Sequence, residues 1–336
     1  MPSVLTAGPG AEPPLLATHE LRKHFPVKAG GFFTRYGLLK AVDGVELEIH
    51  RGETVGLVGE SGCGKTVLGQ LVLGLERPTN GTVSYDGLDI SRLRGPRMKR
   101  LRREVSIVFQ DPYASLNGNK TVEDILAVPL RVHGTRRKAD RDRRILQLIG
   151  DVELSPSDLR KYPHEFSGGQ RQRICIARAL AMNPKLVICD EITSALDVSV
   201  KAQILNLLLR LQKAYHLTYL FISHDLNVVE YISDRIMVMY LGNIVEIMDV
   251  EQLAGERKHP YTTALLSANP EADPRTRDRP KVILGGEVPS PLHPPAGCRF
   301  WPRCNRRMDV CDKSHPDLFE VEPGHRIRCF LYDQDR

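Results

Sequence analysis

The residues with the clearest chemistry lie in a glycine-rich segment between two apolar runs. Residues 59–66 read GESGCGKT and match the pattern GxxxxGK[ST], which follows a strand and opens a helix in phosphate-binding loops. Here the apolar run TVGLVG ends at the first glycine, and the run VLGQLVLGL begins directly after the threonine. Backbone amides at such a turn and the positive end of the following helix both favour a bound phosphate. The segment is therefore predicted to hold the phosphates of a nucleotide.

The lysine and the threonine that end this loop have distinct predicted roles. Lys65 is expected to bridge the β- and γ-phosphates of ATP, and the Thr66 hydroxyl is expected to ligate Mg²⁺. A chance glycine-rich turn is the alternative, and the strand and helix on either side argue against it. Within the loop and the first helical turn, the predicted nucleotide-binding residues are Gly59, Ser61, Gly62, Cys63, Gly64, Lys65, Thr66 and Val67.

A second apolar strand ends in two carboxylates. The run LVIC, residues 186–189, is followed by Asp190 and Glu191. Asp190 is expected to reach Mg²⁺, and Glu191 is expected to polarise the water that attacks the γ-phosphate. Two acids after a strand are common in loops, so this pair gains its meaning from the phosphate loop that precedes it. Together the two segments predict an ATP-hydrolysing site that requires Mg²⁺.

Other apolar runs predict the sheet that positions these loops. Four continuous runs are typical of buried parallel strands: residues 106–109, 186–189, 218–222 and 235–239. Residues 111–185 instead show helical periodicity and predict an inserted helical subdomain. From about residue 268 to residue 336 the sequence is rich in proline and cysteine, and little regular structure is expected there. The pattern predicts an α/β phosphate-loop NTPase core over residues 15–267 with a small cysteine-bearing C-terminal extension.

Length and composition limit the classes of protein that the chain can be. Its 336 residues suffice for one large core and a small second module, but not for two nucleotide-binding domains. No apolar run approaches the roughly 18 residues of a membrane span, so partners must provide any crossing. Basic residues cluster at 92–103 and 131–144, without interleaved aromatics. We interpret these clusters as solvated helix faces, with anionic lipid headgroups as an alternative contact, and expect no nucleic-acid partner.

The first fourteen residues, MPSVLTAGPGAEPP, are rich in Pro, Gly and Ala and are predicted to be a disordered tail. They have neither the basic start nor the apolar stretch of a secretory signal. The seven cysteines are therefore expected to lie in a reducing compartment. In such a compartment clustered thiols bind metals or act catalytically more often than they form disulfides.

A further motif, SGGQ, lies directly before an amphipathic helical run. Ser167, Gly168, Gly169 and Gln170 precede the amphipathic run RQRICIARAL, with the serine at the expected N-cap. GESGCGKT, SGGQ, LVICDE and SALD occur in the order and spacing of ABC transporter ATPase subunits, and the resemblance extends from about residue 15 to the C-terminus. It implies an ABC ATPase core with an antiparallel β subdomain.

The resemblance also implies roles for single residues. In the family two ATPase domains pack head to tail, so that residues 167–170 of one subunit contact the γ-phosphate held by the other. His224 is implied to contact the γ-phosphate within its own subunit, and Asp197 to lie in the loop that communicates across the dimer. Gln110 is implied to sense Mg²⁺ and water. The catalytic set is thus expected to be Lys65, Gln110, Glu191 and His224.

An aromatic residue is implied under the adenine ring. Phe25, in the segment LRKHF, falls where the family places that residue. A core position for Phe25 is the alternative. Three other aromatic residues compete for the role: Phe32, Phe33 and Tyr36.

Four cysteines gather near the C-terminus at spacings C-x5-C-x6-C-x17-C, namely Cys298, Cys304, Cys311 and Cys329. These gaps lack the C-x2-C knuckle of common zinc sites, whereas four thiolates on an irregular loop can hold an iron–sulfur cluster. Four unpaired thiols are the alternative. The segments EVPSP, PPAGC, FWPRC and GHRIRC resemble the C-terminal extension of oligopeptide and dipeptide importer ATPases. In that family such cysteines ligate a [4Fe-4S] cluster, and structural zinc remains the alternative cofactor.

The same resemblance implies partners and a place in the cell. The long segment before KAVDG and the wording FQDPYASLN resemble the dipeptide-type F subunit more than its D counterpart. Expected partners are a second, different ATPase subunit, two transmembrane permeases and an extracytoplasmic peptide-binding protein, with this chain peripheral on the cytoplasmic face of the inner membrane. Nickel chelates or sugars are alternative cargoes. Soluble ABC ATPases that act on DNA or ribosomes carry long coiled coils or two ATPase domains, and neither fits this chain. The cysteine-bearing, importer-like tail argues against an exporter motor.

Overall fold

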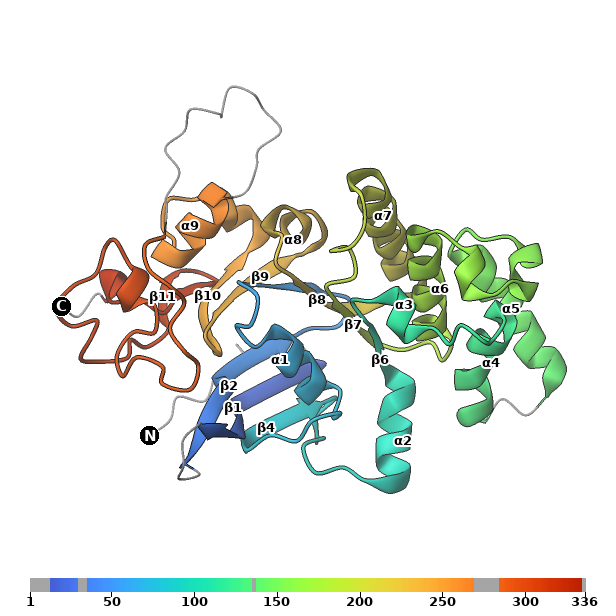
Figure 1. The fold of residues 1–336 in the computed structure, drawn as a ribbon, viewed down its shortest axis with the longest axis horizontal. Helices are drawn as coiled ribbons and strands as arrows, with labels where there is room; N and C mark the ends of the chain where they lie inside the picture. The colour runs from blue at the N-terminus through green and yellow to red at the C-terminus, as the bar shows by residue number, and fades with distance from the viewer. Residues whose placement is uncertain (1–12, 30–34, 135–136, 269–283, 334–336) are drawn as a thin grey trace.

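Two β-sheets organise the chain, and a computed structural model describes residues 13–29, 35–134, 137–268 and 284–333 of it (Figure 1). In the described part, the larger sheet has eight strands in the order β11-β12-β10-β9-β3-β8-β7-β6. Five of them run parallel: β6 (Val105–Val108), β7 (Leu186–Asp190), β8 (Thr218–Ser223), β3 (Thr54–Val58) and β9 (Arg235–Tyr240). The predicted α/β core is confirmed.

The apolar runs form strands because both faces of the sheet are covered. Every residue of β3, β7 and β8 is buried, as expected when helices lie on both sides of a parallel sheet. The carboxyl ends of neighbouring parallel strands meet at one edge of the sheet. The loops after β3, β6, β7 and β8 therefore converge there.

The C-terminal residues extend this sheet beyond β9. Strand β10 (Asn243–Asp249) pairs antiparallel with β9, β12 (His325–Ile327) pairs with β10, and β11 (Phe319–Glu322) pairs with β12. The expectation of little regular structure after residue 268 is therefore wrong for β11 and β12. They are short and lie among prolines and cysteines, so their alternation is weak, but Val321 and Ile327 are buried and pack together.

A second, antiparallel sheet covers the phosphate-loop helix from the other side. Its described strands follow the order β2-β1-β4-β5: β2 (Arg35–Ile49), β1 (Leu16–Ala29), β4 (Asn80–Tyr85) and β5 (Leu88–Asp89). Helix α1 (Lys65–Val72) buries Leu68 and Leu71 in one apolar cluster with Leu16 of this sheet and Ile188 of the larger sheet. The implied antiparallel β subdomain is confirmed, and α1 lies between the two sheets.

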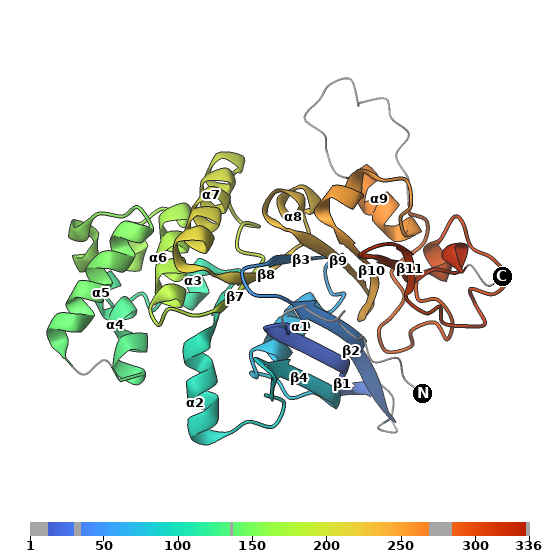
Figure 2. The same cartoon turned by 180° about the vertical axis from the view of Figure 1, so that it is seen from behind.

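Helices fill the region between β6 and β7, with no strand among its described residues. Figures 1 and 2 show them at the end of the molecule opposite the C-terminal strands. They are α3 (Pro112–Ser115), α4 (Val122–Val132), α5 (Lys138–Asp151) and α6 (Gly168–Leu180), with 3₁₀ turns at Pro156–Arg160 and Pro163–Glu165. The limits predicted for the helical subdomain, the ATPase domain and the C-terminal extension stay predictions.

The remaining helices flank the sheets: α2 (Gly95–Glu104), α7 (Val198–Tyr215), α8 (Leu226–Ile232) and α9 (Pro260–Ala268). Short 3₁₀ turns lie at Val250–Ala254, Trp301–Arg303 and Phe330–Tyr332. Throughout the described ranges, no helix combines the length and the apolar character that crossing a bilayer requires. Residues 1–12 of the predicted disordered tail, together with Phe32 and Phe33, lie outside the described residues.

Candidate active site

The phosphate loop connects β3 to α1 and is wedged between two other strands. Gly64 has a φ of 111°, and a Cβ there would lie 2.1 Å from the carbonyl oxygen of Ala41 in β2. A Cβ on Gly59 would lie 2.2 Å from the carbonyl oxygen of Met239 in β9. Only glycine fits at these two positions, since the first needs a left-handed backbone and both touch neighbouring backbone. The glycine pattern therefore specifies a tight turn that exposes its amides.

Lys65 lies across this loop and is 4% exposed. Its Nζ donates to the carbonyl oxygens of Gly59 at 2.7 Å and Glu60 at 3.1 Å, and lies 3.7 Å from Oε1 of Glu191. The ammonium group is thus fixed at the mouth of the loop by two backbone acceptors and one carboxylate. A cation held in this position can neutralise phosphate oxygens bound by the loop amides.

Thr66 and Asp190 form the predicted magnesium pair. The Thr66 hydroxyl donates to Oδ1 of Asp190 at 3.4 Å, across the gap between α1 and the end of β7. Burial raises the pKa of the Asp190 carboxyl, and the nearby Glu191 carboxylate raises it further, while Thr66 and Lys65 oppose the rise. A hydroxyl and a carboxylate are hard oxygen ligands, and Mg²⁺ commonly takes one or two of these and completes its shell with water and phosphate. The pair therefore fits Mg²⁺ held jointly with a nucleotide.

Glu191 is the centre of a hydrogen-bonded group at the carboxyl ends of three parallel strands. Its backbone has a φ of 48°, and its N–H donates to the carbonyl oxygen of Ile222 in β8. Its Oε2 accepts from Nε2 of Gln110 at 3.1 Å and lies 3.3 Å from Nδ1 of His224. With Lys65 on Oε1, the four residues predicted to be catalytic lie together. Their individual roles stay predictions.

In the SGGQ segment Ser167 and Gln170 are exposed, whereas Gly169 is buried. Ser167 caps α6: its hydroxyl accepts from the Gln170 amide at 3.4 Å, and the Gln170 side chain accepts from the Ser167 amide at 3.1 Å. Gly169 is pressed against Val200 of α7, where a Cβ would lie 2.4 Å from the valine side chain. Among the described residues no hydrogen bond or ion pair joins residues 167–170 to the phosphate loop. Within one chain the segment lies apart from the loop.

Asp197 and Phe25 have separate surroundings. Asp197 caps α7, where its carboxylate accepts a hydrogen bond from the Val200 amide at 2.9 Å. This hydrogen bond lowers the pKa of the Asp197 carboxyl. Phe25 is half-buried in β1 and pairs with Leu39 of β2, which is two residues before Ala41 in the sequence. Nζ of Lys23 lies 4.8 Å from the centroid of the Phe25 ring. Both residues stay predicted ligands, because no contact of theirs with the loop is present.

The four C-terminal cysteines share one part of the fold. Cys298, Cys311 and Cys329 are buried and Cys304 is half-buried. Burial raises the pKa of the Cys298 thiol to about 11 and that of the Cys329 thiol to about 12. In the described residues, no three or more His, Cys, Asp or Glu side chains are arranged to hold a metal ion. The structure therefore does not support the predicted zinc or iron–sulfur site.

Two contacts with the phosphate loop were not predicted from the sequence. The Glu60 carboxylate binds Arg303, and the Glu60 amide donates to the Tyr261 hydroxyl at 2.8 Å. The partners follow 243 and 201 residues after Glu60, so no local pattern could have indicated them.

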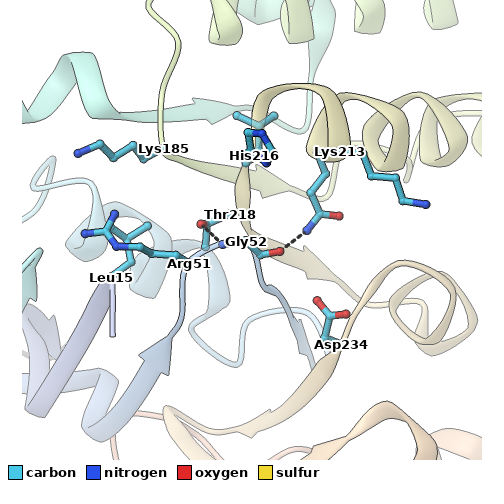
Figure 3. A pocket seen from close by; sticks show the side chains of 10 residues that line it. Leu15, Arg51, Gly52, Lys185, Lys213, His216, Thr218 and Asp234 are labelled. Atoms are coloured by element: carbon cyan, nitrogen blue, oxygen red, sulfur yellow. Dashed lines mark hydrogen bonds between the residues drawn. The ribbon is translucent and has the colours of Figure 1, made fainter. Parts of the chain in front are cut away.

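A cavity of about 600 Å³ lies at the opposite, amino ends of β3 and β8 (Figure 3). Arg51, Lys213, His216 and Asp234 are on its wall, and none of the predicted site residues lines it. The hydrolytic group and this cavity are thus at different edges of the sheet.

Two family models and several solved structures match this chain. The family model "ABC transporter" matches residues 42–194, and "Oligopeptide/dipeptide transporter, C-terminal region" matches residues 245–311. The chain is similar to a post-hydrolysis dimer of the ATP-binding cassette MJ0796 bound to ADP and Pi, with a TM-score of 0.62, 28% identity, and coverage of 70% of this chain and 98% of that one. It is also similar to cbiO1 from Clostridium perfringens, part of the ABC transporter complex cbiONQ, with a TM-score of 0.62, 26% identity, and coverage of 73% and 92%.

Curated relatives match over nearly their whole length. The oligopeptide transport ATP-binding protein AppF of Bacillus subtilis is 46% identical over 320 residues, which are 95% of this chain and 97% of that protein. The dipeptide transport ATP-binding protein DppF of Escherichia coli is 49% identical over 323 residues, 96% of each. The chain therefore belongs to the ABC transporter ATPases, in the family of oligopeptide and dipeptide transport ATP-binding proteins.

Proposed function

We propose that this chain hydrolyses ATP to power the import of peptides, as the motor subunit of an ABC transporter. The hydrogen-bonded group around Glu191, beside the phosphate loop, is the observation that carries the hydrolytic part. Peptides are proposed as cargo because the relatives are named for oligopeptide and dipeptide transport and the C-terminal region matches the model of that name.

Each residue of the group has a chemical task in this proposal. The loop amides and Lys65 bind the phosphates, and Thr66 with Asp190 holds Mg²⁺, which neutralises phosphate charge when bound. Glu191 accepts a hydrogen bond from the attacking water and draws its proton. Gln110 and His224 orient the Glu191 carboxylate and the γ-phosphate. The reaction breaks the bond between the γ-phosphorus and the bridging oxygen, and water supplies the new oxygen.

The proposal includes a second ATPase subunit. Ser167 and Gln170 are exposed at the N-terminus of α6, where a phosphate on another subunit can reach the helix end. The partner is proposed to be a different ATPase, and the pair is proposed to act on two permeases fed by a peptide-binding protein. These permeases would hold the chain on the cytoplasmic face of the membrane.

A [4Fe-4S] cluster on the four C-terminal cysteines is a separate proposal. It rests on the resemblance of the cysteine-bearing segments to the importer ATPases, together with two backbone amides that donate to the sulfurs, Arg306 to Sγ of Cys304 at 3.3 Å and Met308 to Sγ of Cys311 at 3.4 Å. Such bonds stabilise thiolate ligands. Protein purified without oxygen is expected to contain iron and acid-labile sulfide, whereas zinc without iron would contradict the cluster.

Co-purification tests the transport role. The chain, carrying an affinity tag, would be extracted gently from its native membranes and its partners quantified by mass spectrometry. The expected complex contains one second ATPase and two permeases. Ribosomal proteins or DNA-repair proteins in place of permeases would contradict the transport role and leave the ATPase chemistry intact.

A further inference from the structure

The side chain of Glu60, the second residue of the phosphate loop, is bound by the C-terminal part of the chain. Nη1 of Arg303 donates to Oε2 of Glu60 at 2.8 Å, and Nη2 donates to Oε1 at 3.1 Å. The Arg303 side chain is 9% exposed and that of Glu60 is 28% exposed. This is a bidentate, largely buried arginine–carboxylate pair, the geometry in which such a pair best fixes orientation.

The backbone of Glu60 is held from the same direction. Its N–H donates to the hydroxyl of Tyr261, a fully buried residue of α9. Burial raises the pKa of this hydroxyl, so it stays protonated and presents an oxygen acceptor to the loop. Both the main chain and the side chain of Glu60 are therefore anchored by residues more than 200 positions further along the chain.

These two anchors are rigid because they share one aromatic cluster. The ring centroids of Tyr240 and Tyr261 lie 4.7 Å apart, and Phe300 packs 5.3 Å from the first and 5.4 Å from the second. The Arg303 guanidinium lies 6.0 Å from the centroid of the Tyr240 ring. A guanidinium and a hydroxyl held in this way have few alternative rotamers, so they impose a position on Glu60 rather than follow it.

The position of Glu60 matters to the nucleotide site through Lys65. Nζ of Lys65 donates to the Glu60 carbonyl oxygen at 3.1 Å and to the Gly59 carbonyl oxygen at 2.7 Å. A shift of the Glu60 peptide therefore moves both an acceptor of the phosphate-binding lysine and the amides that follow it. The turn is also held by a hydrogen bond from the Gly242 amide to the Cys63 carbonyl oxygen at 2.8 Å and by close packing at its glycines, but neither contact fixes the Glu60 side chain.

We infer that Arg303 and Tyr261 are positioning residues for ATP: by clamping Glu60 they hold the phosphate loop and Lys65 in the shape that binds phosphate. This inference rests on the proposed nucleotide site at residues 59–66. A merely structural pair would instead attach the C-terminal extension to the core without any effect on nucleotide affinity.

The test compares ATP binding and hydrolysis in full-length variants. Arg303→Gln is expected to raise the Kd for a fluorescent ATP analogue and the KM for ATP about tenfold, with kcat changed much less. Arg303→Lys keeps the charge and one hydrogen bond and should restore part of the affinity. Arg307→Gln, an exposed arginine of the same segment, is the matched control and should leave Kd unchanged.

A double-mutant cycle separates positioning from stability. Glu60→Gln and Arg303→Gln should together weaken ATP binding less than the sum of their single effects, because they break one interaction. Additive effects, or a Kd within twofold of the unaltered chain in a folded Arg303→Gln, would overturn the inference. If Arg303→Gln fails to fold, Tyr261→Phe is the deciding variant. A Kd of Tyr261→Phe for the ATP analogue within twofold of that of the unaltered chain would overturn the inference, and a clear rise would support it. Failure of the unaltered chain to bind ATP would refute the proposed nucleotide site instead.

Discussion

Replacing Glu191 with glutamine removes one charge from the hydrolytic group and little else. Glutamate and glutamine side chains have nearly the same shape. The amide oxygen of the glutamine can therefore still accept the hydrogen bond from Nε2 of Gln110, which is 3.1 Å long in the unaltered chain. The hydrogen bond between Thr66 and the buried Asp190 does not involve the substituted side chain. The variant therefore isolates the capacity of the carboxylate to take a proton from water.

The size of the effect follows from these contacts. Loss of a positioned general base lowers rates by about 10²–10⁴-fold, or about 3–5 kcal/mol of activation free energy. ATP affinity should not fall, because the Glu191 carboxylate, 3.7 Å from Nζ of Lys65, competes with phosphate for that cation and the substitution removes the competing charge. Glu191→Gln is therefore expected to bind ATP at least as tightly as the unaltered chain and to turn over at most about one-hundredth as fast.

Phosphate release and nucleotide binding measure the two quantities separately. Release of inorganic phosphate gives kcat with saturating ATP and Mg²⁺, and a fluorescent ATP analogue gives Kd. Glu230→Gln, an exposed glutamate of α8, is the matched control and should retain full activity. A Glu191→Gln variant with a kcat within threefold of the unaltered chain would refute the assignment, and one that lost ATP affinity would refute the reasoning about Lys65.

Three further predictions follow from other residues. Burial raises the pKa of Asp190, so the folded chain holds this proton more tightly than the unfolded chain and loses stability as pH rises through that pKa. Asp190→Asn should therefore raise the melting temperature of the nucleotide-free chain at neutral pH, and it should abolish stabilisation by Mg²⁺–ATP. A lower melting temperature of the nucleotide-free variant would contradict the reasoning about the Asp190 pKa. Ser167→Ala should cost about 1 kcal/mol by loss of the α6 cap and prevent ATP-dependent dimerisation in size-exclusion chromatography, whereas undiminished dimerisation would argue against a phosphate contact. His325→Ala removes the partner that lies 2.8 Å from Oε1 of the fully buried Glu246, whose Oε2 keeps the His259 amide and the Thr262 hydroxyl. It should cost about 1–3 kcal/mol in guanidinium denaturation, and no measurable loss would show that the pair is dispensable.

The grouping of the hydrolytic residues could be predicted from the sequence because each motif directly follows an apolar strand. Gln110, Glu191 and His224 follow β6, β7 and β8, and parallel strands bring their carboxyl ends to one edge. The glycines at 59 and 64 were predictable for the same reason, since a strand-to-helix turn that presents its amides has no room for side chains.

Contacts between segments far apart in the sequence could not be predicted in this way. Tyr261 and Arg303 meet Glu60 through packing of the C-terminal part on β9 and β10, and no periodicity in either segment encodes the meeting. Strand β12 pairs with the edge of β10 and β11 pairs with β12, and segments this short carry too few residues for their alternation to indicate that pairing. The SGGQ segment needs a second subunit to complete its proposed contact, so a single chain does not display it.

ATP-driven uptake of a labelled peptide tests the central claim most directly. The complex isolated through this chain would be placed in proteoliposomes with its peptide-binding protein, and accumulation of a mixture of short labelled peptides would be followed. We predict uptake that requires ATP and Mg²⁺ and that disappears in the complex containing Glu191→Gln. ATP hydrolysis without uptake of any peptide, or uptake unchanged by that substitution, would contradict the account.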